Sequence, residues 1–237
     1  KRLTGAAEFI NNKDRYCLWL VDVSPKELRT MLFVMNRIEL CRQARLAGAP
    51  DRQKLASTPT VFREQKNPES YIIVPSTSSE NRRYIPIGFL DGETIPTNSA
   101  TIIEDATLYD FGILTSNVHM AWMRTVAGRL EMRYRYSAKI VYNNFPWPEV
   151  TDAKKEIISK TAQAILDARE LYPDSSLADL YDELTMPVEL RKAHQANDMA
   201  VMRAYGMQKI VDGKKTWLTE SETVARLFEM YEDLTKK

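Results

Sequence analysis

Apolar and polar side chains alternate along residues 128–142. The even positions from Leu130 to Tyr142 are all apolar or aromatic, and the odd positions from Arg129 to Lys139 are all charged or polar. Because successive side chains of a strand point to opposite faces, this period of two predicts one half-buried β-strand across the whole stretch. Its outer face would carry four cations and one carboxylate in a row. Such a row needs either an anionic partner or internal ion pairs.

The pattern upstream predicts short strands and two helices. Tyr16–Val23 is a largely apolar run and predicts a short buried strand. Ser24 and Pro25 are typical of a helix N-cap and first turn, so we expect one helix from there to about Ala47. Apolar runs separated by turn residues predict further strands at 71–75, 84–90, 94–95 and 100–103. A helix is predicted at 108–127.

Two prolines, Pro146 and Pro148, end this mixed region. The remainder predicts helices at 151–171, 187–205 and 219–234, with a hairpin turn at 211–214. We therefore predict an α+β fold in two domains. Residues 1–148 would form a small mixed or antiparallel sheet with packed helices, and residues 149–237 an all-α domain.

The charge distribution is more informative than the net charge of +1. Residues 25–148 carry 16 basic and 12 acidic side chains, whereas residues 149–237 carry 13 and 17. Residues 124–139 alone hold five cations and one anion. A basic patch in a near-neutral protein is a modest indication of nucleic-acid binding, and a solvated charged face is the alternative.

The cysteines and the apolar runs bear on the location of the protein. Cys17 and Cys41 form no spaced set and fit reduced thiols better than a disulfide framework. No run of about 18 apolar residues is present. We expect a soluble, cytoplasmic protein. The sequence starts at Lys1 without an initiator methionine, which is typical of a piece of a longer protein.

Catalytic motifs are missing from the sequence. It has no glycine-rich loop for a nucleotide or methyl donor, no Walker motif, no G-x-S-x-G and no zinc-type Cys/His spacing. Asp51, Glu64 and Lys66 match a loose nuclease pattern but lack the adjacent buried strands that would gather them around a cation. His119 has no ligand neighbours and is more typical of a packed or hydrogen-bonded histidine. The sequence thus favours a binding module over an enzyme.

The loop at residues 76–83 is a candidate binding segment. Its sequence, S-T-S-S-E-N-R-R, offers hydroxyls, an amide and two arginines. These groups suit phosphate oxygens or base edges, and they equally suit an ordinary hydrophilic hairpin.

Five blocks of sequence point to a known family. They are I-I-V-P-S-T-S-S-E-N-R-R-Y-I-P-I-G-F-L (72–90), F-G-I-L-T-S-N-V-H-M-A-W-M-R (111–124), G-R-L-E-M-R-Y-R-Y-S (128–137), Y-N-N-F-P-W-P (142–148) and M-P-V-E-L-R-K-A-H-Q-A-N-D-M-A-V-M-R-A-Y-G (186–206). The first four resemble the target-recognition domain of MmeI-like type IIL restriction–modification enzymes. The fifth resembles the C-terminal helical domain of the same family.

The resemblance implies a parent enzyme larger than this chain. In that family one polypeptide joins a nuclease domain and an adenine methyltransferase domain to the recognition part. S-adenosylmethionine, and Mg²⁺ for the nuclease, are then expected in the missing part, with no cofactor in this chain. The implied partners are double-stranded DNA and the methyltransferase domain of the same polypeptide. The implied function is sequence-specific DNA recognition for adenine methylation.

The resemblance also implies residues that read bases. Glu131 and Arg133 match a pair that reads one base pair. A carboxylate accepts from cytosine N4 and a guanidinium donates to guanine O6 and N7, so the pair suits C·G. Arg135 matches a further reading position. The family's other variable reading positions match Ser76, Asn98 and Ser99. Ser76 is short and neutral where relatives can carry a longer acidic side chain, and Asn98 suits either adenine or a turn.

Phosphate contacts would position the duplex without specifying its sequence. The candidates are Ser78, Ser79, Arg82, Arg83, Arg124 and Arg129. Two alternatives remain open. Glu131 and Arg133 would alternatively form a surface ion pair worth about 0–1 kcal/mol. The whole chain would alternatively be a non-catalytic protein-interaction scaffold whose arginines pair with an acidic subunit, and salt-dependent duplex binding separates the two functions.

Overall fold

The computed structural model describes residues 1–236 and divides the chain into two compact units. The smaller unit contains residues 1–2 and 16–67, and the larger unit contains residues 3–15 and the chain from Pro68 onward. Among the described residues, no helix combines the length and the hydropathy needed to cross a membrane.

Strand β2 (Ser70–Pro75) is the centre of the larger unit. It pairs antiparallel with β4 (Gly88–Asp91) on one side and with β6 (Ala100–Glu104) on the other. Residues 71–74 are at most 1% exposed, because both faces of this strand are covered. A separate pair joins β5 (Thr94–Pro96) to β1 (Arg2–Thr4). The predicted small antiparallel sheet is confirmed.

A second three-stranded sheet has the order β3 (Thr77–Ser78), β8 (Arg133–Arg135), β7 (Gly128–Leu130). The prediction of one strand over residues 128–142 is wrong. Leu130 pairs with Arg133, so residues 131 and 132 form a two-residue turn, and a short π-helix, η1 (Ala138–Tyr142), follows β8. Tyr134 and Tyr136 are buried as expected, but Leu130 and Met132 are 46% and 69% exposed.

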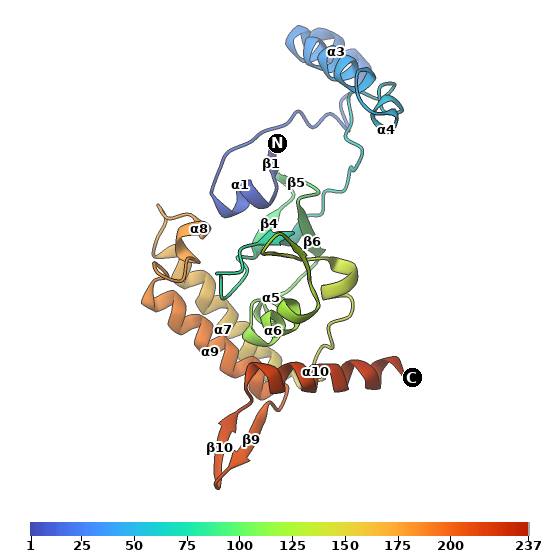
Figure 1. Ribbon diagram of the computed structural model, residues 1–237. Helices are drawn as coiled ribbons and strands as arrows, with labels where there is room; N and C mark the ends of the chain where they lie inside the picture. The colour runs from blue at the N-terminus through green and yellow to red at the C-terminus, as the bar shows by residue number, and fades with distance from the viewer. Residues whose placement is uncertain (237) are drawn as a thin grey trace. The chain divides into compact units, whose positions relative to one another are not determined.

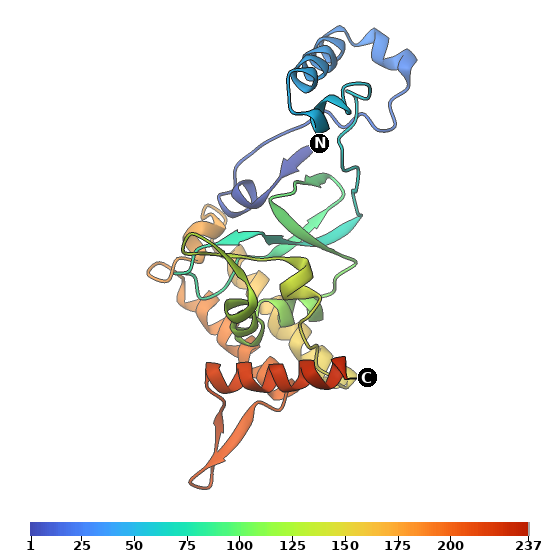
Figure 2. The same ribbon diagram turned by 45° about the vertical axis from the view of Figure 1, so that its right-hand side comes forward.

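Helices supply most of the core of the larger unit. The predicted helix 108–127 is two helices, α5 (Leu108–Leu114) and α6 (Asn117–Val126), because Ser116 caps the second by accepting the N–H of His119. The others are α1 (Ala6–Ile10), α7 (Asp152–Glu170), α8 (Leu177–Leu180), α9 (Val188–Ala204) and α10 (Glu220–Thr235). Helices α7 and α9 lie side by side (Figures 1 and 2).

The C-terminal elements match the predicted ranges closely. Thr219 and Glu222 form the capping box that begins α10. The hairpin of β9 (Gln208–Val211) and β10 (Lys214–Trp217) turns at Asp212 and Gly213, which both have positive φ. Short-range signals of this kind decide local structure without help from distant parts of the chain.

Buried contacts cross the predicted domain boundary at residue 148. The side-chain amide of Asn197 on α9 donates to the carbonyl of Gly112 on α5 at 2.7 Å, and its oxygen accepts from the hydroxyl of Thr161 on α7 at 3.0 Å. A Cβ at Gly112 would lie 2.6 Å from Cγ2 of Ile158, so α5 and α7 pack closely there. One compact unit thus holds residues from both predicted domains, and the boundary stays a prediction.

The smaller unit contains α2 (Pro25–Thr30), α3 (Leu32–Leu46) and α4 (Pro50–Gln53). Ser24 caps α2 as predicted, but the single helix to Ala47 is wrong because the chain breaks at Met31, with φ −102° and ψ 77°. The predicted strand Tyr16–Val23 is also wrong. Its only β pairing in the described residues is an isolated bridge at Tyr16, so no ladder stabilises the run.

Candidate nucleic-acid interface

Glu131 and Arg133 lie at the tip of the β7–β8 hairpin. Glu131 has φ +57°, a left-handed conformation that is uncommon for a residue with a side chain. It therefore leaves the strand, and the expectation that the two residues share one strand face at i and i+2 is wrong. Their side chains still meet: Nη2 of Arg133 donates to Oε2 of Glu131 at 2.8 Å. The side chains are 76% and 47% exposed for Glu131 and Arg133, respectively, and both are accessible to a partner.

Arg135 lies on the same face of β8 as Arg133, because residues i and i+2 of a strand point the same way. Its neighbours across the sheet are Thr77 on β3 and Gly128 on β7. A Cβ placed on Gly128 would meet nothing within 4 Å, so no side chain crowds Arg135 from that strand. The row of exposed cations expected from the sequence is therefore present in shortened form.

Ser76 joins the two sheets of the larger unit. Its N–H donates to the carbonyl of Ser99 at 3.1 Å, and its carbonyl accepts the N–H of Tyr136 at 2.9 Å. Ser99 and Asn98 form the turn between β5 and β6, and Tyr136 follows Arg135 directly. Three segments that are far apart in the sequence, around residues 76, 98 and 135, thus meet at one place.

The two residues of the 98–99 turn differ in what they offer. The hydroxyl of Ser99 accepts the N–H of Ala6 at 3.0 Å and lies 2.9 Å from Oγ1 of Thr97, so it already holds local structure. The side chain of Asn98 is exposed. Asn98 is therefore the freer of the two for contact with a base edge.

The candidate phosphate contacts are less uniform than expected. Ser78 is 1% exposed, and the hydroxyl of Ser79 accepts the N–H of Asn81 at 3.2 Å. Arg124 holds Glu220 of α10 through Nε and Nη2 at 2.8 and 3.0 Å and also donates to the carbonyl of Arg83. These contacts tie Arg124 to the C-terminal helix. They give Arg124 a structural role, and its contact with phosphate stays a prediction.

Arg82 and Arg83 are the remaining arginines of the 76–83 loop. Arg83 is exposed, whereas Arg82 is partly buried, and this burial lowers its pKa. Both line a pocket of about 500 Å³ that also contains Glu80, Glu183 and Glu220. The carboxylates offset the cations there, so the pocket has no strong net preference for an anion.

Tyr84, which directly follows the 76–83 loop, belongs to a buried polar network. The hydroxyl of Tyr84 donates to Oδ2 of Asp198 at 2.7 Å, and Oδ1 accepts the N–H of Asn117 at 2.7 Å. Burial raises the pKa of Asp198 to about 6. His194 stacks on Tyr84 with ring centroids 4.1 Å apart, and burial, followed by the nearby Arg169, holds the pKa of His194 well below its ordinary value. Sequence analysis missed this network, because its partners are more than 75 residues apart.

His119 anchors the base of strand β8. Its Nε2 lies 3.0 Å from the hydroxyl of Tyr136, its ring packs edge-on against Phe145, and it is 1% exposed. The prediction of a packed, hydrogen-bonded histidine is confirmed. Tyr136 was expected only as an apolar position, although a tyrosine there gave a usable signal for a buried hydrogen bond.

The buried histidine predicts an acid-sensitive fold. Burial lowers the pKa of His119 to about 3, whereas in the unfolded chain it titrates near 6.5. Below pH 6.5 the unfolded state therefore binds more protons, and stability falls as the pH is lowered, by up to about 1.4 kcal/mol per pH unit. His119 alone should lower the free energy of unfolding by about 2 kcal/mol between pH 7 and pH 5, and the buried His194, whose pKa is also lowered, acts in the same direction.

Denaturant unfolding of the His119→Gln variant beside the wild type at both pH values measures this contribution. The variant should lose less stability on acidification. Asp198, with its raised pKa, acts in the opposite direction between about pH 6 and 4, so only the difference between the two proteins isolates His119. Equal losses in both would contradict the assignment.

The alternative nuclease set has no support in the geometry. Asp51 on α4 pairs with Lys54 at 3.3 Å, and residues 64–66 form no strand. In residues 1–236 no group of three His, Cys, Asp or Glu side chains could hold a metal ion.

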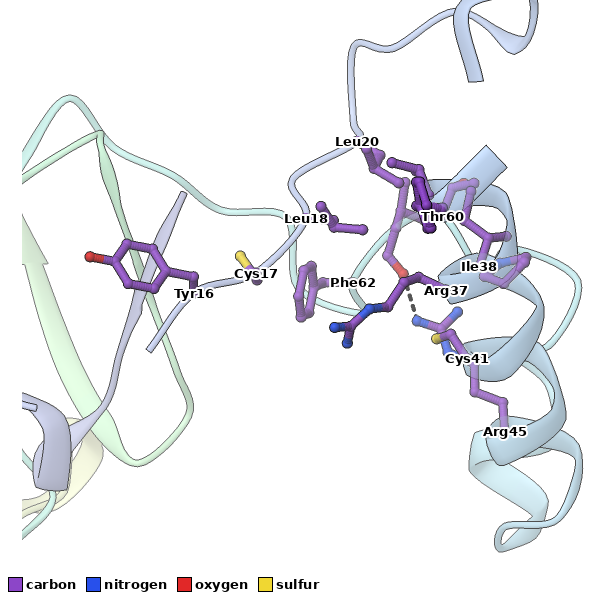
Figure 3. Close-up of a pocket in the computed structure, with 14 residues that line it drawn as sticks. Tyr16, Cys17, Leu18, Leu20, Arg37, Ile38, Cys41, Arg45, Thr60 and Phe62 are labelled. Atoms are coloured by element: carbon purple, nitrogen blue, oxygen red, sulfur yellow. Dashed lines mark hydrogen bonds between the residues drawn. The ribbon is translucent and has the colours of Figure 1, made fainter. Parts of the chain in front are cut away.

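The smaller unit contains a pocket of another character. Its volume is about 530 Å³, and Figure 3 shows Leu18, Ile38 and Phe62 around it, between the 16–20 segment and α3. Arg45 donates to the carbonyls of Leu55, Thr58 and Val61 at 2.6–2.7 Å and so holds the wall in place. Cys17 and Cys41, neither of which forms a disulfide, also line it. The mainly apolar lining does not suit a nucleic-acid backbone.

Comparison with known proteins gives consistent matches over the whole chain. The family model described as "MmeI, target recognition domain" matches residues 1–149, and "MmeI, C-terminal domain" matches residues 150–237. DNA methyltransferase A of Bacillus subtilis (strain 168) is 39% identical over 239 residues, covering 100% of this chain and 26% of that protein. A solved structure of the type IIL restriction–modification enzyme MmeI in complex with DNA is 45% identical, with a TM-score of 0.92. It covers 100% of this chain and 31% of that one.

Proposed function

We propose that this chain reads a short sequence in double-stranded DNA. The chain belongs to the MmeI family and carries its target recognition and C-terminal domains. The chain spans about a quarter of the methyltransferase and under a third of the MmeI chain that it matches. Any chemistry on DNA therefore belongs to a larger protein, and the contribution of these residues is to select the site.

One observation carries this proposal: the base-reading candidates from three distant segments lie next to one another. The backbone of Ser76 bonds to Ser99 on one side and to Tyr136, next to Arg135, on the other. The exposed hairpin tip with Glu131 and Arg133 continues the same strand. Strand β3 pairs with β8 at Tyr134 and Arg135, so the tip beyond them is a two-stranded ribbon of β7 and β8. A two-stranded ribbon fits the major groove of B-DNA, where each base pair has its own donor and acceptor pattern.

Each residue has a role that follows from its chemistry. Glu131 accepts from cytosine N4 and Arg133 donates to guanine O6 and N7 across one C·G base pair. Their mutual ion pair, about 0–1 kcal/mol at an exposed site, is weak enough to open or share in favour of a base. Arg135 contacts a second base pair, and Asn98 suits the N6 and N7 groups of adenine. Arg83, with its exposed side chain, remains the better candidate for a phosphate contact and the partly buried Arg82 the weaker one, since carboxylates offset both within their shared pocket. Ser78 and Arg124 are left out because Ser78 is buried and Arg124 is already paired.

The site selected in this way would be the target of an adenine-specific DNA methyltransferase, with a linked nuclease, in the same polypeptide. S-adenosylmethionine would supply the methyl group there, in residues outside this chain. The target adenine has to leave the duplex stack to be reached, so recognition must hold the flanking bases while one base is flipped out. The C-terminal helices then buttress the recognition part, as the Arg124–Glu220 pair suggests.

Salt-dependent duplex binding tests the proposal. The methylation motif of DNA from cells that express the full-length protein first defines the cognate duplex. We expect binding to it to weaken steeply with salt, with a slope of about −0.9 for each phosphate contacted. The Arg135→Ala variant should lose about 1–3 kcal/mol of discrimination at one base pair and keep its non-specific affinity. Failure of the protein to bind duplex DNA at low salt would favour the scaffold function instead.

A further inference from the structure

Arg129 lies on the face of the hairpin away from the base-reading arginines. It is paired with Tyr134, so the two side chains share a face, and that face is opposite to the one that carries Arg133 and Arg135. The guanidinium carbon of Arg129 is 3.7 Å from the centroid of the Tyr134 ring. A cation so close to an aromatic face is attracted to it, and the ring is itself mostly buried, at 8% exposed.

The same guanidinium also holds the turn. Nη1 of Arg129 donates to the carbonyl of Met132 at 2.9 Å. Met132 directly follows Glu131, whose left-handed φ of +57° costs energy for a residue with a Cβ. One side chain of β7 therefore contacts both the two-residue turn and β8, and it fixes the carbonyl that comes just after the strained residue.

We propose that Arg129 is a positioning residue that holds the turn in the conformation from which Glu131 and Arg133 read their base pair. This inference rests on the proposed function and assigns to Arg129 a role other than phosphate contact. A hairpin fixed before binding pays less for ordering when it enters the groove, so its preorganisation should appear as discrimination between base pairs.

Lysine is the diagnostic replacement. Arg129→Lys keeps the positive charge but loses the planar guanidinium that stacks and donates at the same time. A phosphate contact would largely tolerate this change. A positioning residue would not.

Binding of the full-length protein to the cognate duplex, and to a duplex with the C·G pair replaced, gives the test. We expect Arg129→Lys to lower discrimination at that base pair about tenfold, with discrimination at the other positions and the salt slope unchanged. Tyr134→Leu should lower discrimination at the same base pair, and the double variant should lose less than the sum of the two single losses, because both changes remove the stacking of Arg129 on Tyr134. Tyr134→Phe keeps the ring and should bind as the wild type does.

Hydrogen exchange of the turn amides provides a measurement without DNA. The amides of Met132 and Arg133 should exchange faster in Arg129→Lys, with the melting temperature nearly unchanged. Unchanged exchange with normal discrimination, or a salt slope shallower by about one, would overturn the inference and make Arg129 a phosphate contact or a bystander. If the wild-type protein itself shows no discrimination at that base pair, the proposed reading role fails first, and the exchange result alone still reports on the turn.

Discussion

A full-length protein carrying Glu131→Lys together with Arg133→Asp should methylate a motif that differs from the wild-type motif at one base pair, with C replaced by G. The reason is that the donor and the acceptor exchange places along the hairpin tip. The ammonium at position 131 then donates to guanine, and the carboxylate at position 133 accepts from cytosine N4 on the other strand. Sequencing the methylated sites of host DNA measures the result.

The double change is sharper than either single change. It keeps an ion pair between the two positions with the charges reversed. In the native pair, Nη2 of Arg133 lies 2.8 Å from Oε2 of Glu131. A purely structural ion pair therefore predicts an unchanged motif. Glu131→Lys alone would put two cations side by side and should weaken recognition by about 1–3 kcal/mol without creating a new motif.

Arg226→Glu with Glu229→Arg is the matched control. This pair on α10 is also exposed, with side chains at 52% and 65% exposure and a 2.9 Å contact, and its reversal should leave the motif as it is. Methylation by the hairpin variant at an unchanged motif would show that Glu131 and Arg133 do not read a base. Loss of all methylation in a hairpin variant with a normal melting temperature would show that the double change abolishes recognition without creating a new motif. That result would contradict the predicted change from C to G.

The hairpin also shows why its outline could not be predicted from the sequence. The two-residue turn between Leu130 and Arg133 makes odd and even positions exchange faces, so that Arg129 shares a face with Tyr134. The alternation in the sequence nevertheless runs through the turn without interruption, so the period of two gives no sign of it. The usual signal for such a turn is Asn-Gly or Asp-Gly, and here Glu131 takes the left-handed position. Asp212 and Gly213 give that signal in the second hairpin, which was predicted correctly.

The other elements are predicted correctly where the signal lies within a few residues, and incorrectly or not at all where the partner lies far away in the chain. Ser24 is predicted correctly as a helix cap, because the N–H that it bonds, that of Glu27, lies three residues away. Tyr16–Val23 has an apolar composition, but within residues 1–236 its β pairing is limited to the isolated bridge at Tyr16, and composition alone cannot supply a ladder. Asn197 and Asp198 looked like ordinary polar helix positions, since their buried partners lie 81 to 114 residues away.

The members of the candidate site come from the family resemblance, and their spatial arrangement comes from the structure. Family resemblance named Glu131, Arg133, Arg135 and the positions around Ser76 and Asn98. Their adjacency depends on strand pairing between segments far apart in the chain, which no periodicity reveals. The reading roles themselves stay predictions until the motif experiment is done.

A fragment that ends at residue 148 should fail to fold cooperatively, although the sequence pattern places a domain boundary there. The cut would remove Asn197 from the carbonyl of Gly112 and Asp198 from the hydroxyl of Tyr84, leaving buried polar groups unpaired. Each such loss costs about 1–3 kcal/mol. It would also expose the side of α5 that Ile158 covers. Together these losses are comparable to the whole stability of a typical domain, about 5–15 kcal/mol.

Thermal unfolding followed by circular dichroism distinguishes the outcomes. We expect a broad, non-cooperative melt for residues 1–148 and a recovered transition when residues 149–237 are supplied separately, because the helices α7 and α9 can then dock. A chain nicked at the exposed Asp212–Gly213 turn is the control for a break in the backbone itself, and it should melt sharply, since that turn makes no core contact. A sharp transition in the 1–148 fragment alone would show that the boundary separates two independently stable domains. The C-terminal helices would then be an attachment to the recognition part and not a component of its core.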